Sequence, residues 1–182
     1  MGLCDITAGR IEPCKDTVGG ITAIYFCNYA DITGITYLTT AGNEDVIEVV
    51  AGTPNAYKYE LKGGNNFEQT LTSSRENGTT FVEQTLTAVL KKQDIATHKQ
   101  IKMLSYGRPR VIVQDYNNNF WLCGVDNGAE VTTAAISTGQ NMGDLSGYTI
   151  TLVANEKIPA PFIDASSEAG LSGNGFTVVP GL

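Results

Sequence analysis

The sequence has little of the side-chain chemistry that enzymes use. Its 182 residues contain one histidine, His98, and only 17% of them are charged. General acid–base and nucleophilic catalysis draw most often on histidine placed beside a nucleophile. His98 lies among polar neighbours in a predicted helix, so we expect an ordinary exposed or half-buried histidine. We expect no enzymatic activity.

Ligand motifs for metals and cofactors are also scarce. None of the cysteines forms a C-x-x-C pair, and one histidine does not complete a common zinc set. We expect reduced, mostly buried thiols, with a Cys4–Cys14 disulfide as the alternative; the cysteines are Cys4, Cys14, Cys27 and Cys123. The Gly-bearing segment 139–144 lacks the lysine of a phosphate loop. Carboxylates near turns are expected to be solvated, a weak calcium site being the alternative. We therefore expect no metal and no cofactor.

Positive charge is in short supply. The formal net charge is −7 and the isoelectric point is about 4.6, which does not favour nucleic-acid binding because phosphate contacts need clustered Lys and Arg. The basic residues that do gather are Lys91, Lys92, Lys99, Lys102, Arg108 and Arg110. They are either a solvated helix face or a patch that meets the acidic remainder of an identical neighbour.

Long apolar runs are missing. No stretch approaches 18 apolar residues, and the first residues show neither a basic segment nor an apolar one of the kind that opens a signal peptide. We expect a soluble chain that does not enter a membrane.

What the sequence does have is Thr, Gly, Asn and Ser in strand-and-turn patterns. Alternating β-branched and aromatic residues bounded by turns predict strands. They fall at 20–29, 32–38, 56–61, 67–73, 79–90, 111–114, 120–125, 129–138 and 148–154. Segment 45–50 fits a strand or a helical turn. These elements predict a mainly β fold, a β-sandwich or barrel of two packed antiparallel sheets with one short helix and extended termini.

A long hairpin is the most distinctive element. Segments 68–72 and 83–87 both read Glu-Gln-Thr-Leu-Thr, which fits a weak repeat or, as we prefer, two paired strands. The polar segment 74–78 ends in Asn77-Gly78, a strong turn signal. It therefore forms the predicted tip.

One helix is predicted at 91–104. Asp94 can cap it, with Ile95, Ile101 and Leu104 facing inward and lysines outward.

Three regions follow from these patterns. We expect an irregular N-terminal arm (1–19), with a first short strand as the alternative, a β domain (20–162) and a small, Gly-rich C-terminal extension (163–182) that is mobile or docked on a partner.

The order of features resembles a known family. Val-Ile-Val-Gln-Asp-Tyr-Asn-Asn-Asn-Phe-Trp-Leu-Cys-Gly (111–124) follows the helix, then comes a Thr-Gly, Gly-Asp, Gly-Tyr segment (138–152), then Asn-Glu-Lys-Ile-Pro (155–159). Over residues 56–162 this resembles the tail tube proteins of tailed bacteriophages and, more distantly, tube subunits of contractile injection systems. The most specific points are Thr138, Gly139, Gly143, Asp144, Gly147, Tyr148 and Glu156.

The resemblance implies a structural virion protein, made in the bacterial host cytoplasm and placed in the virion tail. Its partners would be further copies of itself, in stacked hexameric rings, and other tail proteins. DNA would pass through the lumen without specific binding, and an acidic lumen would repel its phosphates. The resemblance implies that the long hairpin (67–90) and the termini bridge one ring to the next, with candidate interface residues at the hairpin tip: Ser73, Ser74, Arg75, Glu76, Asn77 and Gly78. If the basic residues form a patch rather than a solvated face, the second expected interface includes Lys91, Lys92, Lys99 and Lys102.

Two alternatives stay open. Another tail or connector component, such as a terminator or hub subunit, would share the fold. A monomeric ligand- or carbohydrate-binding β module would instead use an aromatic row around Trp121 and the tyrosines.

Overall fold

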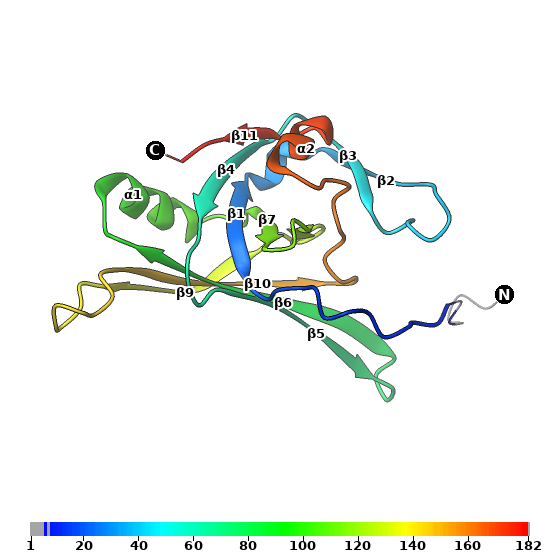
Figure 1. The fold of residues 1–182 in the computed structure, drawn as a ribbon, viewed down its shortest axis with the longest axis horizontal. Helices are drawn as coiled ribbons and strands as arrows, with labels where there is room; N and C mark the ends of the chain where they lie inside the picture. Colours follow the sequence, from blue (N-terminus) through cyan, green and yellow to red (C-terminus); the bar gives the residue numbers. More distant parts are fainter. Residues whose placement is uncertain (1–5, 7, 182) are drawn as a thin grey trace.

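Two β-sheets pack face to face in the computed structural model, which describes residues 6 and 8–181 (Figure 1). The strand orders are β11-β4-β1-β7-β8 and β5-β6-β10-β9, and β2-β3 form a separate pair. The strands are β1 Ile21–Cys27, β2 Gly34–Tyr37, β3 Ile47–Ala51, β4 Asn55–Glu60, β5 Asn66–Ser74, β6 Thr79–Lys91, β7 Arg110–Asp115, β8 Phe120–Cys123, β9 Glu130–Ser137, β10 Gly147–Glu156 and β11 Thr177–Val179. The mainly β sandwich predicted from the sequence is confirmed. Neither sheet closes into a barrel over the described residues.

The predicted long hairpin forms one half of the four-stranded sheet. β5 and β6 pair antiparallel from Asn66↔Thr87 to Ser74↔Thr79. Strand β10 then pairs with the other side of β6, and β9 pairs with β10. Both sheets have a face of alternating apolar residues, because successive side chains of a strand point to opposite faces. Between the two faces lies a core that includes Leu86 and Ile150.

A second core lies on the other face of the five-stranded sheet. β1 is buried on both faces, so Ile24 packs toward the four-stranded sheet and Tyr25 packs away from it. Leu171 and Phe176, from the C-terminal region, fill this second core together with Ile47. The C-terminal region therefore makes a third layer.

Helix α1 spans Ile95–Leu104, shorter than the predicted 91–104, because β6 continues to Lys91 and pairs there with Gly147. The Asp94 cap is confirmed: its carboxylate accepts a hydrogen bond from the Thr97 N–H at 2.7 Å. Ile101 is buried and Leu104 is half-buried. The inward position predicted for Ile95 is wrong, since this first helical residue is 92% exposed.

The C-terminal prediction of a mobile or partner-docked tail is wrong as far as Gly181. Helix α2 (Glu168–Gly173) packs on the body, and β11 adds to β4 in parallel. The Lys58 ammonium lies 2.6 Å from the Glu168 carboxylate and helps to hold the helix. A short 3-10 turn, Tyr29–Asp31, follows β1.

Unlike the C-terminal region, the described part of the N-terminal segment forms no regular structure on the body of the fold. Residues 8–20 form no helix or strand and are all exposed. Two residues anchor this segment: the backbone N–H and C=O of Val18 both pair with the Asn117 side chain at 3.0 and 2.8 Å, and the Gly20 carbonyl accepts from the Tyr116 N–H at 3.3 Å.

Three cysteines fall among the described residues, and all are free thiols. Cys27 and Cys123 are buried as expected, and burial raises the pKa of each to about 12. Cys14 is exposed. The alternative Cys4–Cys14 disulfide lies outside the described residues, because Cys4 is not among them.

Candidate functional site

The four-stranded sheet has an outer face that carries the outward-pointing side chains of β5, β6, β10 and β9. It looks away from the core, and no described element covers it in Figure 1. Successive side chains of a strand point to opposite faces, so every second residue lies on this outer face. Many of these residues are threonines: Thr70, Thr72, Thr85, Thr87, Thr133, Thr149 and Thr151. One row across the sheet runs Asn66, Thr87, Thr151, Thr133. The face is thus mainly polar and rich in hydroxyl groups, with Phe81, Val89 and Val153 as apolar exceptions.

The charges on this outer face are mostly negative. Glu68 lies opposite Thr85, Glu83 lies between Thr70 and Asn155, and Glu130 lies opposite Val153. Lys91 stands at the margin, where β6 ends. A surface with this balance repels polyanions over a Debye length of about 8 Å at physiological salt.

Over the described residues no strand pairs with either edge of the four-stranded sheet, and the Gln93 side-chain amide reaches β9, donating to the Ser137 carbonyl at 2.6 Å. β5 and β9 are edge strands, and almost all of their residues are exposed. Each pairing within the sheet is antiparallel, so β5 and β9 run in opposite directions. Natural proteins usually cover or interrupt such edges, because unpaired N–H and C=O groups recruit another strand.

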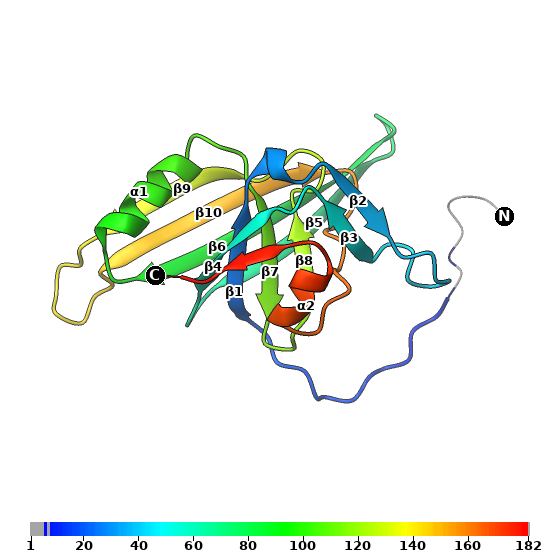
Figure 2. The ribbon, with the colours of Figure 1, turned by 90° about the horizontal axis from the view of Figure 1, so that it is seen from above.

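The hairpin tip projects beyond the sandwich at one end of this sheet (Figures 1 and 2). Ser73 contacts Thr80 through their hydroxyl oxygens at 3.1 Å, and the Asn77 N–H donates to the Ser74 hydroxyl at 3.3 Å. Arg75, Glu76, Asn77 and Gly78 form the four-residue turn and are exposed.

The opposite end of the sheet carries α1 and the loop 138–146 (Figures 1 and 2). The exposed residues Lys91, Lys92, Lys99 and Lys102 gather at this end. The residues predicted for interfaces therefore do not form one patch. They mark the two ends of one subunit.

Arg108 and Arg110 do not belong with these lysines. Arg110 is buried, and its guanidinium donates to the carbonyls of Val125, Tyr29 and Ile32 at 3.0, 3.2 and 2.9 Å. Both arginines also stack on the Tyr29 ring, 4.2 and 4.4 Å from its centroid. Arg110 is a structural cation of the interior.

The motif residues of 138–148 shape the loop and its return into the sheet. The Asp144 carboxylate accepts from the backbone N–H groups of Gln140 and Asn141 at 3.0 and 2.7 Å, and these bonds lower its pKa. Gly139 adopts φ +76°, whereas Thr138 and Gly143 are simply exposed. Tyr148 is buried, and its hydroxyl donates to the Asp94 carbonyl at 3.1 Å.

Glu156 is a buried carboxylate at the far end of β10. It accepts hydrogen bonds from the backbone N–H groups of Asp126 and Asn127, the latter at 2.8 Å. Burial raises its pKa, while the amide bonds oppose the shift. Glu156 therefore fixes the turn between β8 and β9, and it does not face the outer sheet surface.

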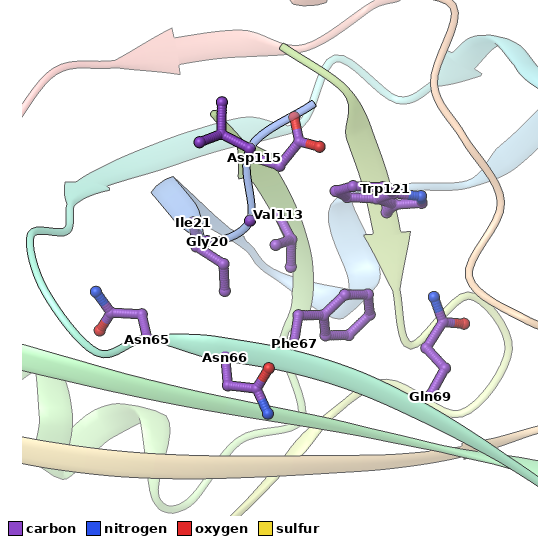
Figure 3. A pocket seen from close by; sticks show the side chains of 11 residues that line it. Gly20, Ile21, Asn65, Asn66, Phe67, Gln69, Val113, Asp115 and Trp121 are labelled. Carbon is purple, nitrogen blue, oxygen red and sulfur yellow. The ribbon is translucent and has the colours of Figure 1, made fainter. Parts of the chain in front are cut away.

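A cleft of about 370 Å³ opens between β5 and the five-stranded sheet (Figure 3). Phe67 and Trp121 line it with ring centroids 6.4 Å apart, and Trp121 also packs on Phe162 at 5.2 Å. Sequence reasoning named Trp121 but missed the cleft, because strands distant in sequence form it. Two of its polar side chains are already engaged: Gln69 accepts from the Ala160 N–H at 2.7 Å, and Asp115 accepts from the N–H groups of Asn117 and Asn119.

The described part of the chain offers neither a metal site nor a membrane-spanning helix. It contains no cluster of three or more His, Cys, Asp or Glu side chains placed to hold a metal ion, and no helix long and apolar enough to cross a membrane. Comparison of the chain with protein-family models, curated proteins and solved structures found no match.

Proposed function

We propose that this chain is a non-catalytic tail tube subunit, which assembles into stacked rings around a conduit for DNA. The observation that carries the proposal is the four-stranded sheet. It combines two open edges of opposite direction with an uncovered, polar outer face. An isolated globule gains nothing from such edges, whereas a ring pairs every one of them.

Ring closure follows from the strand directions. Because β5 and β9 are antiparallel, each added copy continues the antiparallel ladder and leaves an identical edge for the next. Six copies of the four-stranded sheet would form a barrel of roughly 24 strands, larger than the barrels of about 16–18 strands that already hold an aqueous channel. The head-to-tail contact closes on itself when the rotation per copy completes a circle.

In such a ring the outer sheet face lines the lumen. Glu68, Glu83 and Glu130 would then face the passing DNA. Like-charge repulsion keeps the phosphates off the wall, so that DNA slides without specific binding. The threonines supply a hydrated, uncharged surface between the carboxylates.

Stacking would use the two ends of the subunit. The hairpin tip, with Arg75 and Glu76, lies at one end, and the lysines of β6 and α1 lie at the other. Opposite ends with different chemistry favour a polar, head-to-tail stack over a symmetric dimer. The virion tail would be the site of the finished assembly, with other tail proteins at its two ends.

Cysteine cross-linking tests the ring contact. In a background with Cys4 and Cys14 replaced by Ser, Thr70→Cys on β5 is combined with a single Cys at each position from 131 to 136 on β9. A disulfide needs Cα atoms about 4.4–6.8 Å apart, so the register of the contact decides which combinations link. We expect a ladder of covalent oligomers for some of them. Only monomers across the whole series, under conditions where rings are seen, would exclude β5–β9 pairing.

The cleft beside Trp121 favours a second candidate, a monomeric ligand-binding module. The aromatic pair of Phe67 and Trp121 offers a stacking wall. The rim residues Gln69 and Asp115 argue against this candidate, because their side chains already accept hydrogen bonds from backbone N–H groups of the protein. Calorimetric titration with a sugar panel distinguishes the two candidates: saturable binding by a concentrated monomer would favour the module.

A further inference from the structure

Three Asn-Gly dipeptides occur in the chain, and the fold treats them differently. They are Asn77-Gly78, Asn127-Gly128 and Asn174-Gly175. Asn-Gly is the dipeptide most prone to attack by its own backbone, since glycine has no side chain to shield its nitrogen. Whether a given copy reacts depends on how firmly the fold holds the asparagine side chain and the glycine N–H.

At Asn127 and Asn174, hydrogen bonds hold both the asparagine side chain and the N–H of the following glycine. The Asn127 N–H donates to Glu156 at 2.8 Å, its side chain donates to the Asn155 carbonyl at 2.6 Å, and the Gly128 N–H donates to Gly124 at 3.2 Å. Asn174 is buried and its side chain donates to the Glu48 carbonyl. The Gly175 N–H donates to Ser172 at 3.3 Å.

Asn77 is held only through its backbone. Asn77 and Gly78 lie in the exposed four-residue tip of the hairpin, and a β-carbon placed on Gly78 would meet open space. The bond from the Asn77 N–H to the Ser74 hydroxyl is long, at 3.3 Å. Among the described residues no acceptor pairs with the Asn77 side chain or with the Gly78 N–H.

We propose that Asn77 is a self-modification site, where the folded chain converts asparagine to aspartate and isoaspartate. The Gly78 nitrogen loses its proton and attacks the Asn77 side-chain carbonyl carbon. The new N–Cγ bond forms as the Cγ–Nδ2 bond breaks, and ammonia leaves with the proton to give a cyclic imide. One water then opens either carbonyl of the imide, and no electrons are exchanged.

The products change the tip in a defined way. Arg75 and Glu76 balance each other before the reaction, and the new carboxylate makes the tip net negative. Opening toward isoaspartate also inserts a methylene into the main chain. The site concerns the chemistry of the tip itself and does not depend on the assembly proposed above.

Incubation at mildly alkaline pH followed by peptide mapping tests the site. The full chain is kept monomeric by dilution, as checked by light scattering, and a parallel sample is unfolded in guanidinium chloride. An asparagine whose side chain and following N–H are hydrogen-bonded reacts only when the fold opens locally. In the folded chain we therefore expect Asn77 to convert at least about tenfold faster than Asn127 and Asn174. In the unfolded sample the three rates should agree within about threefold, because local sequence alone then acts.

Asn77→Gln is the matched variant, because it keeps the amide but needs a larger, slower-forming ring. It should lose the early acidic species in ion-exchange chromatography and leave conversion at Asn127 and Asn174 unchanged. Conversion of folded Asn77 no faster than that of Asn127, or an acidic species that persists in Asn77→Gln, would overturn the proposal.

Discussion

The buried carboxylate of Glu156 accepts a hydrogen bond from the backbone N–H of Asn127 at 2.8 Å, across 29 residues of sequence. The resemblance marked Glu156 as a motif position, and the contact shows what it does. It fixes the turn that leads into edge strand β9. Glu156 therefore supports the four-stranded sheet indirectly, by holding the backbone of the turn that precedes β9.

Glu156 should make stability depend on pH. Burial raises its pKa in the folded chain above the ordinary value of 4.5, so the folded state holds the proton more tightly than the unfolded state does. Its contribution to the unfolding free energy is greatest below pH 4.5. It falls as pH rises to and beyond the raised folded pKa. The stability advantage of the wild type over Glu156→Gln should therefore shrink across that window.

Denaturant unfolding at a series of pH values measures this difference, with Glu76→Gln at the exposed tip as the matched control. A difference between wild type and Glu156→Gln that grows with pH would contradict the assigned direction of the pKa shift.

The two glycines of the 143–147 segment should respond very differently to alanine. A β-carbon on Gly147 would collide with the Leu90 carbonyl in the neighbouring strand, whereas one on Gly143 would meet nothing within 4 Å. Gly147→Ala should cost about 2–3 kcal/mol of unfolding free energy. Gly143→Ala should stay within about 0.5 kcal/mol. Equal effects in denaturant titrations would contradict the β6–β10 register.

The C-terminal layer should be part of the cooperative fold. Leu171 is fully buried in the second core, and Leu171→Ala should destabilise the chain by about 2–5 kcal/mol. Met142→Ala, at an exposed loop position, should change stability by less than about 0.5 kcal/mol. Calorimetry of both variants checks this. A neutral Leu171→Ala would restore the mobile tail expected from the sequence.

The proposed lumen predicts a charge effect on DNA transit. A variant with Glu68→Lys, Glu83→Lys and Glu130→Lys should still form tubes but should slow DNA ejection by about tenfold or more, and less so at high salt. The matched control reverses Glu44 and Asp45, which lie in a loop away from this face. Time-resolved DNA release from particles carrying each variant is the measurement. Normal ejection from the triple variant would count against an acidic lumen.

Local signals in the sequence predicted most of the strands. Alternating β-branched residues marked the long hairpin, Asn77-Gly78 marked its tip, and Asp94 marked the start of α1. These features depend on neighbours within a few residues, so a pattern suffices to find them.

Non-local features could not be predicted in the same way. Leu171 and Phe176 stand among small and polar residues, and only the second core explains why α2 and β11 form there. The outward position of Glu68, Glu83 and Glu130 depends on strand register, which a sequence does not state. The cleft at Phe67 and Trp121 joins strands more than fifty residues apart.

Electron microscopy of the purified chain tests the central claim most directly. Negatively stained samples across a concentration series, with light scattering in parallel, report whether the open edges of β5 and β9 pair between copies. The account predicts rings with a central channel, stacking into tubes as concentration rises. A chain that stays monomeric at the highest concentrations, with no rings in any field, would contradict it.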